Sequence, residues 1–396
     1  MSRNHDNFAD LITFTRASTA TFVGSNGLIQ SATTNIPRID FDPVTNDRKG
    51  LLIEESRTNL FTYSEDFSDS DWTKFGSATV TASTVTTPDG GQSGFVLETS
   101  STNRLEDTPS TAITGTATLS IFGKHNNVSF IVLQIIDSSA NGQRQWFKID
   151  DGTLGSSTAV GTGKNLSNAS ITDMGSGFYR LSMSVDGFSS QTGRCLIYLA
   201  RTDSSFDASS GDAAIIYGAQ LEQGSFPTSY IPTSGAAATR AADIATIATS
   251  AFGYNQDEGT FLAEASTFDG EGSSKIVFLA SSSGAQSTDR FLLFFSSSEA
   301  LKFEIETGNV QQANIVRGTG FLNSFKKMAA AYQENNAAFA ITDLAASTDT
   351  SCTIPANTIL TLGRFTGTNL SLNGHMKKFQ YFPRRLSDTQ LQEITR

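Results

Sequence analysis

Short stretches in which apolar and polar residues alternate recur through most of this chain. Examples are residues 116–121 (TATLSI), 180–185 (RLSMSV) and 302–306 (KFEIE). Because successive side chains of a β-strand point to opposite faces, each stretch predicts a strand with one buried face. Clusters of Gly, Ser, Asn and Asp between the stretches favour turns. The pattern predicts an all-β protein of tandem antiparallel β-sandwich (jelly-roll) domains.

More continuous apolar runs predict central strands at residues 128–136 and 196–200, and apolar runs at 276–279 and 291–295 predict further strands. Hydrophobic residues make up 38% and charged residues 17% of the chain, whereas globular domains average about 45–50% and 25%. Thr, Ser, Gly and Asn fill the difference, and these residues suit strands and turns. The 29 Phe residues favour ordered cores over disorder.

The end of the chain predicts one short helix. Ser387 and Gln390 have the spacing of a capping box, with Ser387 as the N-cap. Leu386 and Leu391 are placed to form a hydrophobic staple around the cap. We therefore expect the helix to pack on the sheet through Leu391 and Ile394.

The sequence divides into three parts. Residues 1–62 are irregular and rich in turn signals, and we expect them to form an N-terminal attachment or intersubunit segment that packs on a neighbour. Residues 63–233 predict a first β-sandwich, and residues 240–396 predict a second. The small, turn-favouring residues at 232–238 predict the boundary between them.

The net charge and the lack of long apolar stretches limit the class of protein. The net charge of −11 disfavours binding to nucleic acid. No apolar stretch approaches the roughly 20 residues that span a bilayer, and the first residues contain no signal-peptide core. We therefore expect no membrane insertion and synthesis in a cytoplasm. If the protein works outside the cell, we expect it to leave by a route other than secretion, such as lysis.

Neither metal nor cofactor binding is predicted. Cys195 and Cys352 fall in different predicted domains, so we expect two free, buried thiols. His5, His125 and His375 fall in three separate parts, which disfavours a zinc site. The acidic run at 269–272 lacks the full spacing of an EF-hand loop and predicts a turn.

A search for catalytic carboxylates yields one pair. Glu304 and Glu306 lie two apart on a predicted strand, roughly 7 Å apart along one face, and a retaining glycosidase needs two carboxyl groups about 5–5.5 Å apart. The run at 304–309 departs from the Glu-x-Asp-x-x-Glu pattern of sandwich glucanases, since Glu306 replaces Asp and Asn309 replaces the last Glu. We therefore predict no catalytic residue and interpret the pair as the outer face of a strand.

Aromatic rings are the remaining candidates for sugar binding. A pyranose can stack on an exposed ring, and Trp72 and Trp146 both fall in the first predicted sandwich. Arg144 lies beside Trp146 and could donate hydrogen bonds to hydroxyl groups. These three residues are the candidate carbohydrate site, while burial of both indoles in a core or domain interface is the alternative.

Five sequence blocks resemble a known family. They are FTRASTATF at 14–22, PRIDFDP at 37–43, GLLIEESRTNL at 50–60, GAQLEQG at 218–224 and FPTSYIPT at 226–233. Together they frame about the first 240 residues and are similar to blocks of phage and prophage tail- or head-fibre (spike) proteins. The ending NGHMKKFQYFPRRLS at 373–387 resembles the closing strand of a concanavalin-A-like or laminin-G-like sandwich.

The resemblance implies a virion component that is made in the host cytoplasm and released by lysis, and it transfers no catalytic residue. It implies a homotrimer with carbohydrate-binding-module-like domains, which contacts other virion proteins through residues 1–62 and host-surface polysaccharide through its sandwiches. Two alternatives stay open. One is a purely architectural decoration or connector protein, and the other is a polysaccharide depolymerase.

Overall fold

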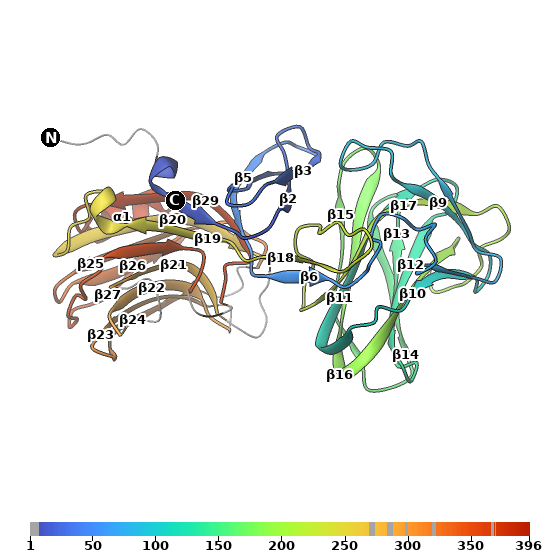
Figure 1. Cartoon of the computed structure of the whole chain (residues 1–396). Helices are drawn as coiled ribbons and strands as arrows, with labels where there is room; N and C mark the ends of the chain where they lie inside the picture. Colours follow the sequence, from blue (N-terminus) through green and yellow to red (C-terminus); the bar gives the residue numbers. More distant parts are fainter. Residues whose placement is uncertain are drawn as a thin grey trace.

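Two β-sandwiches lie side by side in the computed structural model of this chain, joined by a narrow connection at the middle of the molecule (Figure 1). The structure describes residues 8–268, 274–282, 288–297, 300–318, 322–365, 368 and 370–396. His5 and the turn predicted at 269–272 lie outside these residues. The predicted all-β class is confirmed, with antiparallel pairing in each sheet.

The C-terminal sandwich consists of two seven-stranded sheets. In the first sheet the strand order is β1 (Thr13–Thr15), β19 (Ile244–Ala248), β28 (Ile359–Leu362), β21 (Lys275–Ser281), β22 (Arg290–Phe295), β23 (Leu301–Thr307) and β24 (Val310–Arg317). In the second sheet it is β27 (Leu344–Asp349), β26 (Ala337–Ile341), β25 (Lys326–Gln333), β20 (Glu258–Thr267), β29 (Gly374–Phe382), β5 (Arg48–Ile53) and β4 (Ile39–Phe41).

Aromatic side chains from both sheets fill the core of this sandwich. The ring of Phe261 on β20 lies 4.7 Å from that of Phe278 on β21, and Phe291 on β22 lies 4.6 Å from Tyr332 on β25. The alternation predicted for residues 302–306 is confirmed on β23, where Phe303 is completely buried. The Phe-rich composition thus supplies the contact between the sheets.

The middle sandwich is organised by one strand of 23 residues, β16 (Phe178–Ala200). Its first half pairs with β11 (Ala112–His125) and β15 (Asn165–Asp173), and its second half pairs with β12 (Phe130–Asp137) and β10 (Arg104–Asp107). Positive φ angles at Gly187 and Ser190 accompany the shift in pairing register between the halves. A single strand therefore belongs to both walls around one core.

The other strands of this sandwich extend its two walls. They are β7 (Thr73–Phe75), β8 (Thr79–Ala82), β9 (Phe95–Glu98), β13 (Gly142–Lys148), β14 (Thr153–Val160) and β17 (Ala213–Gln223). Side chains from both halves of β16, such as Leu181 and Ile197, are completely buried in the same cluster. The strands predicted at 116–121 and 180–185 lie within β11 and β16 and are confirmed.

The N-terminal segment is built into the C-terminal sandwich. After a 3-10 turn, η1 (Phe8–Leu11), β1 pairs with β19, while β5 pairs with β29. Phe14, Leu51 and Ile53 are buried in the core of that sandwich. The sequence predicts that residues 1–62 pack on a neighbour, and the strands β1, β4 and β5 of this segment pack on this chain's own C-terminal sandwich. The C-terminal sandwich is consequently discontinuous, with residues 63–233 inserted into it.

Two short pairings complete this arrangement. Strands β2 (Ala20–Val23) and β3 (Ile29–Ala32) form a hairpin. At the connection, β6 (Arg57–Asn59) pairs with β18 (Ala238–Arg240), and Figure 1 shows both strands between the sandwiches. The chain therefore crosses between the sandwiches twice, and the two crossings are hydrogen-bonded to each other.

The predicted helix is confirmed as α1 (Asp388–Ile394). A second 3-10 turn, η2 (Thr249–Ala251), follows β19. Ser387 accepts a hydrogen bond from the Gln390 amide, and the Gln390 side chain accepts one from the Ser387 amide. Leu386 and Leu391 are buried against the outer face of β20, β25 and β26. In the described part of the chain, no helix combines the length and apolar character needed to cross a membrane.

Candidate functional site

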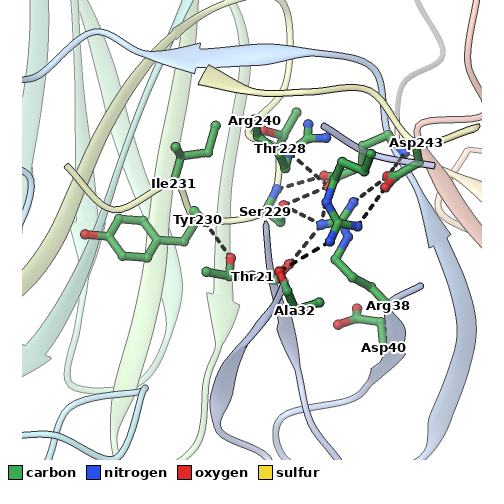
Figure 2. A network of polar contacts seen from close by, with 12 residues as sticks. Thr21, Ala32, Arg38, Asp40, Thr228, Ser229, Tyr230, Ile231, Arg240 and Asp243 are labelled. Carbon is green, nitrogen blue, oxygen red and sulfur yellow. Dashed lines mark hydrogen bonds and ion pairs between the residues drawn. The ribbon is translucent and has the colours of Figure 1, made fainter. Parts of the chain in front are cut away.

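The sequence blocks meet at the junction of the two sandwiches. We define the junction network as Arg16, Arg38, Glu54, Arg240 and Asp243, whose side chains are at most 1% exposed. The first three belong to blocks of the N-terminal segment, and the last two follow the predicted linker. Segments far apart in sequence are therefore joined by charge at one buried place (Figure 2).

The Arg38 guanidinium lies at the centre of the junction network (Figure 2). Its Nη2 lies 2.5 Å from Asp243 Oδ2, and its Nη1 lies 2.8 Å from Glu54 Oε2. Arg16 Nη1 lies 3.1 Å from the other oxygen of Asp243. Removing two carboxylates and three guanidinium groups from water is costly, and the mutual attraction of the opposite charges, with the hydrogen bonds between them, offsets that cost. Among the described residues, Nε of Arg38 and Nε of Arg240 have no hydrogen-bond partner.

The charge state of Glu54 follows from its neighbours. Burial by itself raises the pKa of a carboxyl, but the charges of Arg240 and Arg38 and the hydrogen bonds from Ser229 hold the pKa of Glu54 far below its usual range. The amide and hydroxyl of Ser229 each lie 2.7 Å from a Glu54 oxygen. Glu54 is therefore an anion that connects the end of β5 to Ser229, Arg38 and Arg240.

The blocks at 218–224 and 226–233 hold each other. Glu222 is completely buried and accepts hydrogen bonds from the Thr228 amide at 3.0 Å and the Gln220 side chain at 2.6 Å. Gln220 Oε1 in turn accepts from the Ile231 amide at 2.6 Å. Across the junction, the Thr21 hydroxyl donates to the Tyr230 carbonyl. These two blocks therefore form one hydrogen-bonded unit, which we call the lock, and it connects the middle sandwich to the N-terminal segment.

A cleft of about 470 Å³ lies beside this lock, and we call it the interdomain cleft. One wall is the edge strand β15 with part of β16, and the other combines β2, β4, β5 and β29. Half-buried rings of Phe22, Phe41 and Phe268 line it. Exposed Asn168 and Thr172 are among its polar groups. This mixture of apolar surface and a few polar groups is typical of small-ligand sites.

Asp40 and His375 form a buried pair in the wall of the cleft. His375 Nε2 lies 2.7 Å from Asp40 Oδ2, and the other Asp40 oxygen accepts from the Val23 amide at 2.7 Å. The imidazole also packs edge-on against Phe268, with 5.0 Å between ring centroids. The pair thus pins β29 against the N-terminal segment and orients one ring of the cleft.

Arg180 is the cationic group that β16 contributes to the cleft. Its Nη2 donates to Ser120 Oγ at 3.1 Å, and its guanidinium carbon lies 5.5 Å from the centre of the Phe122 ring. Burial lowers the pKa of Arg180, although the charges of Glu222 and Glu54 oppose this effect. Among the described residues, its Nε has no hydrogen-bond partner.

The structure places the predicted sugar-binding rings in the interior. Trp72 is completely buried, donates from Nε1 to the Tyr63 carbonyl at 2.7 Å, and packs on Phe61. Trp146 is 2% exposed and lies under Phe206, in a different cluster. Neither indole presents a face on which a sugar could stack. The alternative given above, burial of both indoles, is therefore the one that the structure shows. The reason is that each ring covers apolar strand residues.

The third predicted residue, Arg144, lies beside Trp146 but away from Trp72. Its side chain donates to Gln134 and covers the Phe206 ring with 5.1 Å between the guanidinium carbon and the ring centre. None of the three residues lines the interdomain cleft. The structure therefore does not bring the predicted set together.

The carboxylate pair on β23 also lies outside the cleft lining. Glu306 forms an ion pair with Arg290, and burial raises the pKa of Glu304. Both side chains are on the face opposite Phe303 and Ile305, as predicted. Among the described residues, no group of three or more His, Cys, Asp or Glu side chains is arranged to hold a metal ion.

Sequence reasoning missed the cleft residues, although it located their elements. Arg180 begins the alternating stretch 180–185 on its polar face, and Asp40 and His375 lie inside recognised blocks. An arginine on the polar face of a strand is usually solvated, so the pattern gave no reason to select it. That face becomes the wall of a cleft only because the C-terminal sandwich lies opposite it.

No family model and no curated protein matches this chain. Among solved structures, it is similar to a SAP-like pentraxin from Limulus polyphemus (11% identity, 35% of this chain, 70% of that chain, TM-score 0.29). It is also similar to the CBM40 domain of a Ruminococcus gnavus sialidase (13% identity, 36% and 84%, TM-score 0.30). Domains LG4–5 of mouse laminin α1 match at 12% identity (73% and 90%, TM-score 0.26).

Proposed function

We propose that this protein is a recognition protein that holds a saccharide in the interdomain cleft. The single observation that carries the proposal is the composition of the cleft, whose walls bring half-buried Phe rings together with exposed amide and hydroxyl groups. A sugar presents C–H faces that pack on rings and hydroxyl groups that exchange hydrogen bonds. A rigid junction beside the cleft supports binding by holding both walls in place.

We further propose that the protein works on a phage particle, as part of a tail or head fibre or spike that attaches to host-surface polysaccharide. The five blocks that resemble fibre proteins support this role. A homotrimer and contacts of residues 1–62 with other virion proteins belong to the same proposal. Because residues 13–53 are largely built into a sandwich, exposed stretches such as 25–26, 33–37 and 44–47 are the parts of this segment available for such a contact.

A glycan array probed with the full chain tests the binding role. Wild type should bind a defined group of saccharides, and Phe41→Ala should weaken that binding because a ring of the cleft is lost. The matched control is Phe75→Ala, which removes an exposed ring on β7 outside the cleft. Absence of binding to any saccharide would overturn the role.

Labelling of intact particles with antibody against the chain tests the location on the virion. Gold particles should decorate a fibre or spike in electron micrographs. Particles that carry no label, with the antigen found only in the lysate, would contradict the virion role while leaving glycan binding intact.

The junction network favours one second candidate, a purely architectural connector. Five buried charged side chains and two paired crossings hold the sandwiches together, which suits a rigid spacer as well as a receptor. The glycan array separates the two candidates, because a connector should bind no saccharide, although the antibody should still label it on the particle.

We also propose that binding occurs without cleavage, so the depolymerase alternative is disfavoured. Glu304 and Glu306 do not line the cleft, and Glu306 is paired with Arg290. Reducing-end release from host polysaccharide measures cleavage directly. Release that disappears in Glu304→Gln would establish the depolymerase instead.

A further inference from the structure

The charged groups in the wall of the interdomain cleft are paired, with one exception. Asp40 pairs with His375 at 2.7 Å, and Lys49 pairs with Asp42 at 3.2 Å. Glu54 is held by Arg38. Partners within the protein already engage these groups, so they offer little attraction for an anionic ligand.

Arg180 is the exception. Within the described ranges, no Asp or Glu forms an ion pair with its guanidinium, and Nε has no acceptor. Glu222 and Glu54 attract it from further away. Glu54 is already paired with Arg38, and Glu222, which accepts hydrogen bonds from neutral groups of Thr228 and Gln220, forms no ion pair with Arg180 within the described ranges. An arginine stays charged under these conditions, and a partly buried cation without an anion is costly.

The surroundings of Arg180 suit an oxygen-rich ligand. Ser170 and Ser182 lie next to it on β15 and β16, with 2.8 Å between their hydroxyl oxygens, and both line the cleft. Asn168 and Thr172 are exposed along the same edge strand. A guanidinium binds carboxylates through strong charge-assisted hydrogen bonds, and the flanking hydroxyl and amide groups can bind the rest of a sugar.

We propose that the saccharide held in the interdomain cleft is acidic and that Arg180 binds its carboxylate. This inference rests on the proposed function and names the class of its ligand. The net charge of −11 repels an anion at long range, so preference for an acidic over a neutral sugar depends on this one local cation.

The test compares matched ligands on the full chain. The probes are oligosaccharides that contain glucuronic, galacturonic or sialic acid, their carboxyl-reduced counterparts, and sulfated oligosaccharides of the same backbones. Wild type should bind one carboxylate form roughly tenfold or more tighter than its reduced form. Arg180→Gln should bind the two forms equally, and Arg180→Lys should keep part of the preference, because it retains charge without the planar fork.

The matched control is Arg194→Gln, on the same strand but outside the cleft lining, which should keep the full preference. A thermal melt of each variant reports folding, and if Arg180→Gln does not fold, the partial loss in Arg180→Lys carries the test. Equal binding of acidic and reduced forms by wild type, an undiminished preference in Arg180→Lys, or binding of the sulfated forms alone would overturn this inference. Binding of no saccharide would overturn the proposed function with it.

Discussion

Arg38 Nη2 and Asp243 Oδ2 lie 2.5 Å apart, although 205 residues separate them in the sequence. Both side chains are completely buried. The pair joins the N-terminal segment to the start of the C-terminal part, and the whole middle sandwich lies between them in the chain. It therefore fixes the two ends of the insertion at one point.

Asp243→Asn should destabilise the protein by about 3–5 kcal/mol, because it leaves the buried Arg38 and Arg16 guanidinium groups without their shared anion. Urea denaturation measures the change. The control is Asp151→Asn, which removes a partner of Lys148 at the surface and should cost less than about 1 kcal/mol. Similar losses in both variants would contradict a structural role for the junction network.

Residues 240–396 expressed alone should not fold, since this fragment lacks β1, β4 and β5 and the buried side chains of Phe14, Leu51 and Ile53. We expect poorly dispersed NMR spectra and no cooperative thermal transition. The control fragment, residues 57–240, retains the middle sandwich and the β6–β18 pairing and should fold. A well-folded 240–396 fragment would instead favour residues 1–62 as a separate attachment segment.

Because of Asp107, the free energy of unfolding should fall as the pH rises towards neutral. Burial and the charges of Asp71 and Asp69 raise its pKa to about 7, against an opposing hydrogen bond from the Thr108 amide. Its Oδ2 has no partner among the described residues. Because the folded pKa exceeds the unfolded value of about 3.9, the stability that the protonated form contributes is complete below about pH 4 and is lost by about pH 7.

Asp107→Asn removes this titration. The variant should be about 1–3 kcal/mol more stable than wild type at pH 8, and the difference should vanish near pH 4. Urea denaturation at the two pH values measures this, with exposed Asp257→Asn as the control. A variant that is less stable than wild type at pH 8 would show that the Asp107 carboxylate is satisfied.

The two cysteine thiols should be inert in the folded protein. Cys195 and Cys352 are 0% and 2% exposed and unpaired as disulfides, and burial raises the pKa of both thiols. Because the thiolate is the reactive form, DTNB at pH 8 should modify neither until guanidinium unfolds the chain. Ser70→Cys, at an exposed position, supplies the comparison, and an equally fast wild-type thiol would contradict the burial.

The secondary-structure elements could be predicted from short stretches of sequence. Alternation at 116–121, 180–185 and 302–306 predicted strands because the two-residue period of a pleated strand is a property of a few adjacent residues. Ser387 and Gln390 predicted the start of α1 because a capping box closes within one helical turn. The free, buried state of the two cysteines was also predicted correctly.

The tertiary structure alone decided where these elements meet. Nothing local in residues 13–53 indicates that they pair with strands beyond residue 240, because the partners of a β-strand can lie at any distance along the chain. The burial of Trp72 and Trp146 was decided in the same way, by the residues that pack over them. Arg180 faces a ligand-sized cleft only because the insertion brings β16 opposite β29, and pairing across that distance is set by packing and buried charge.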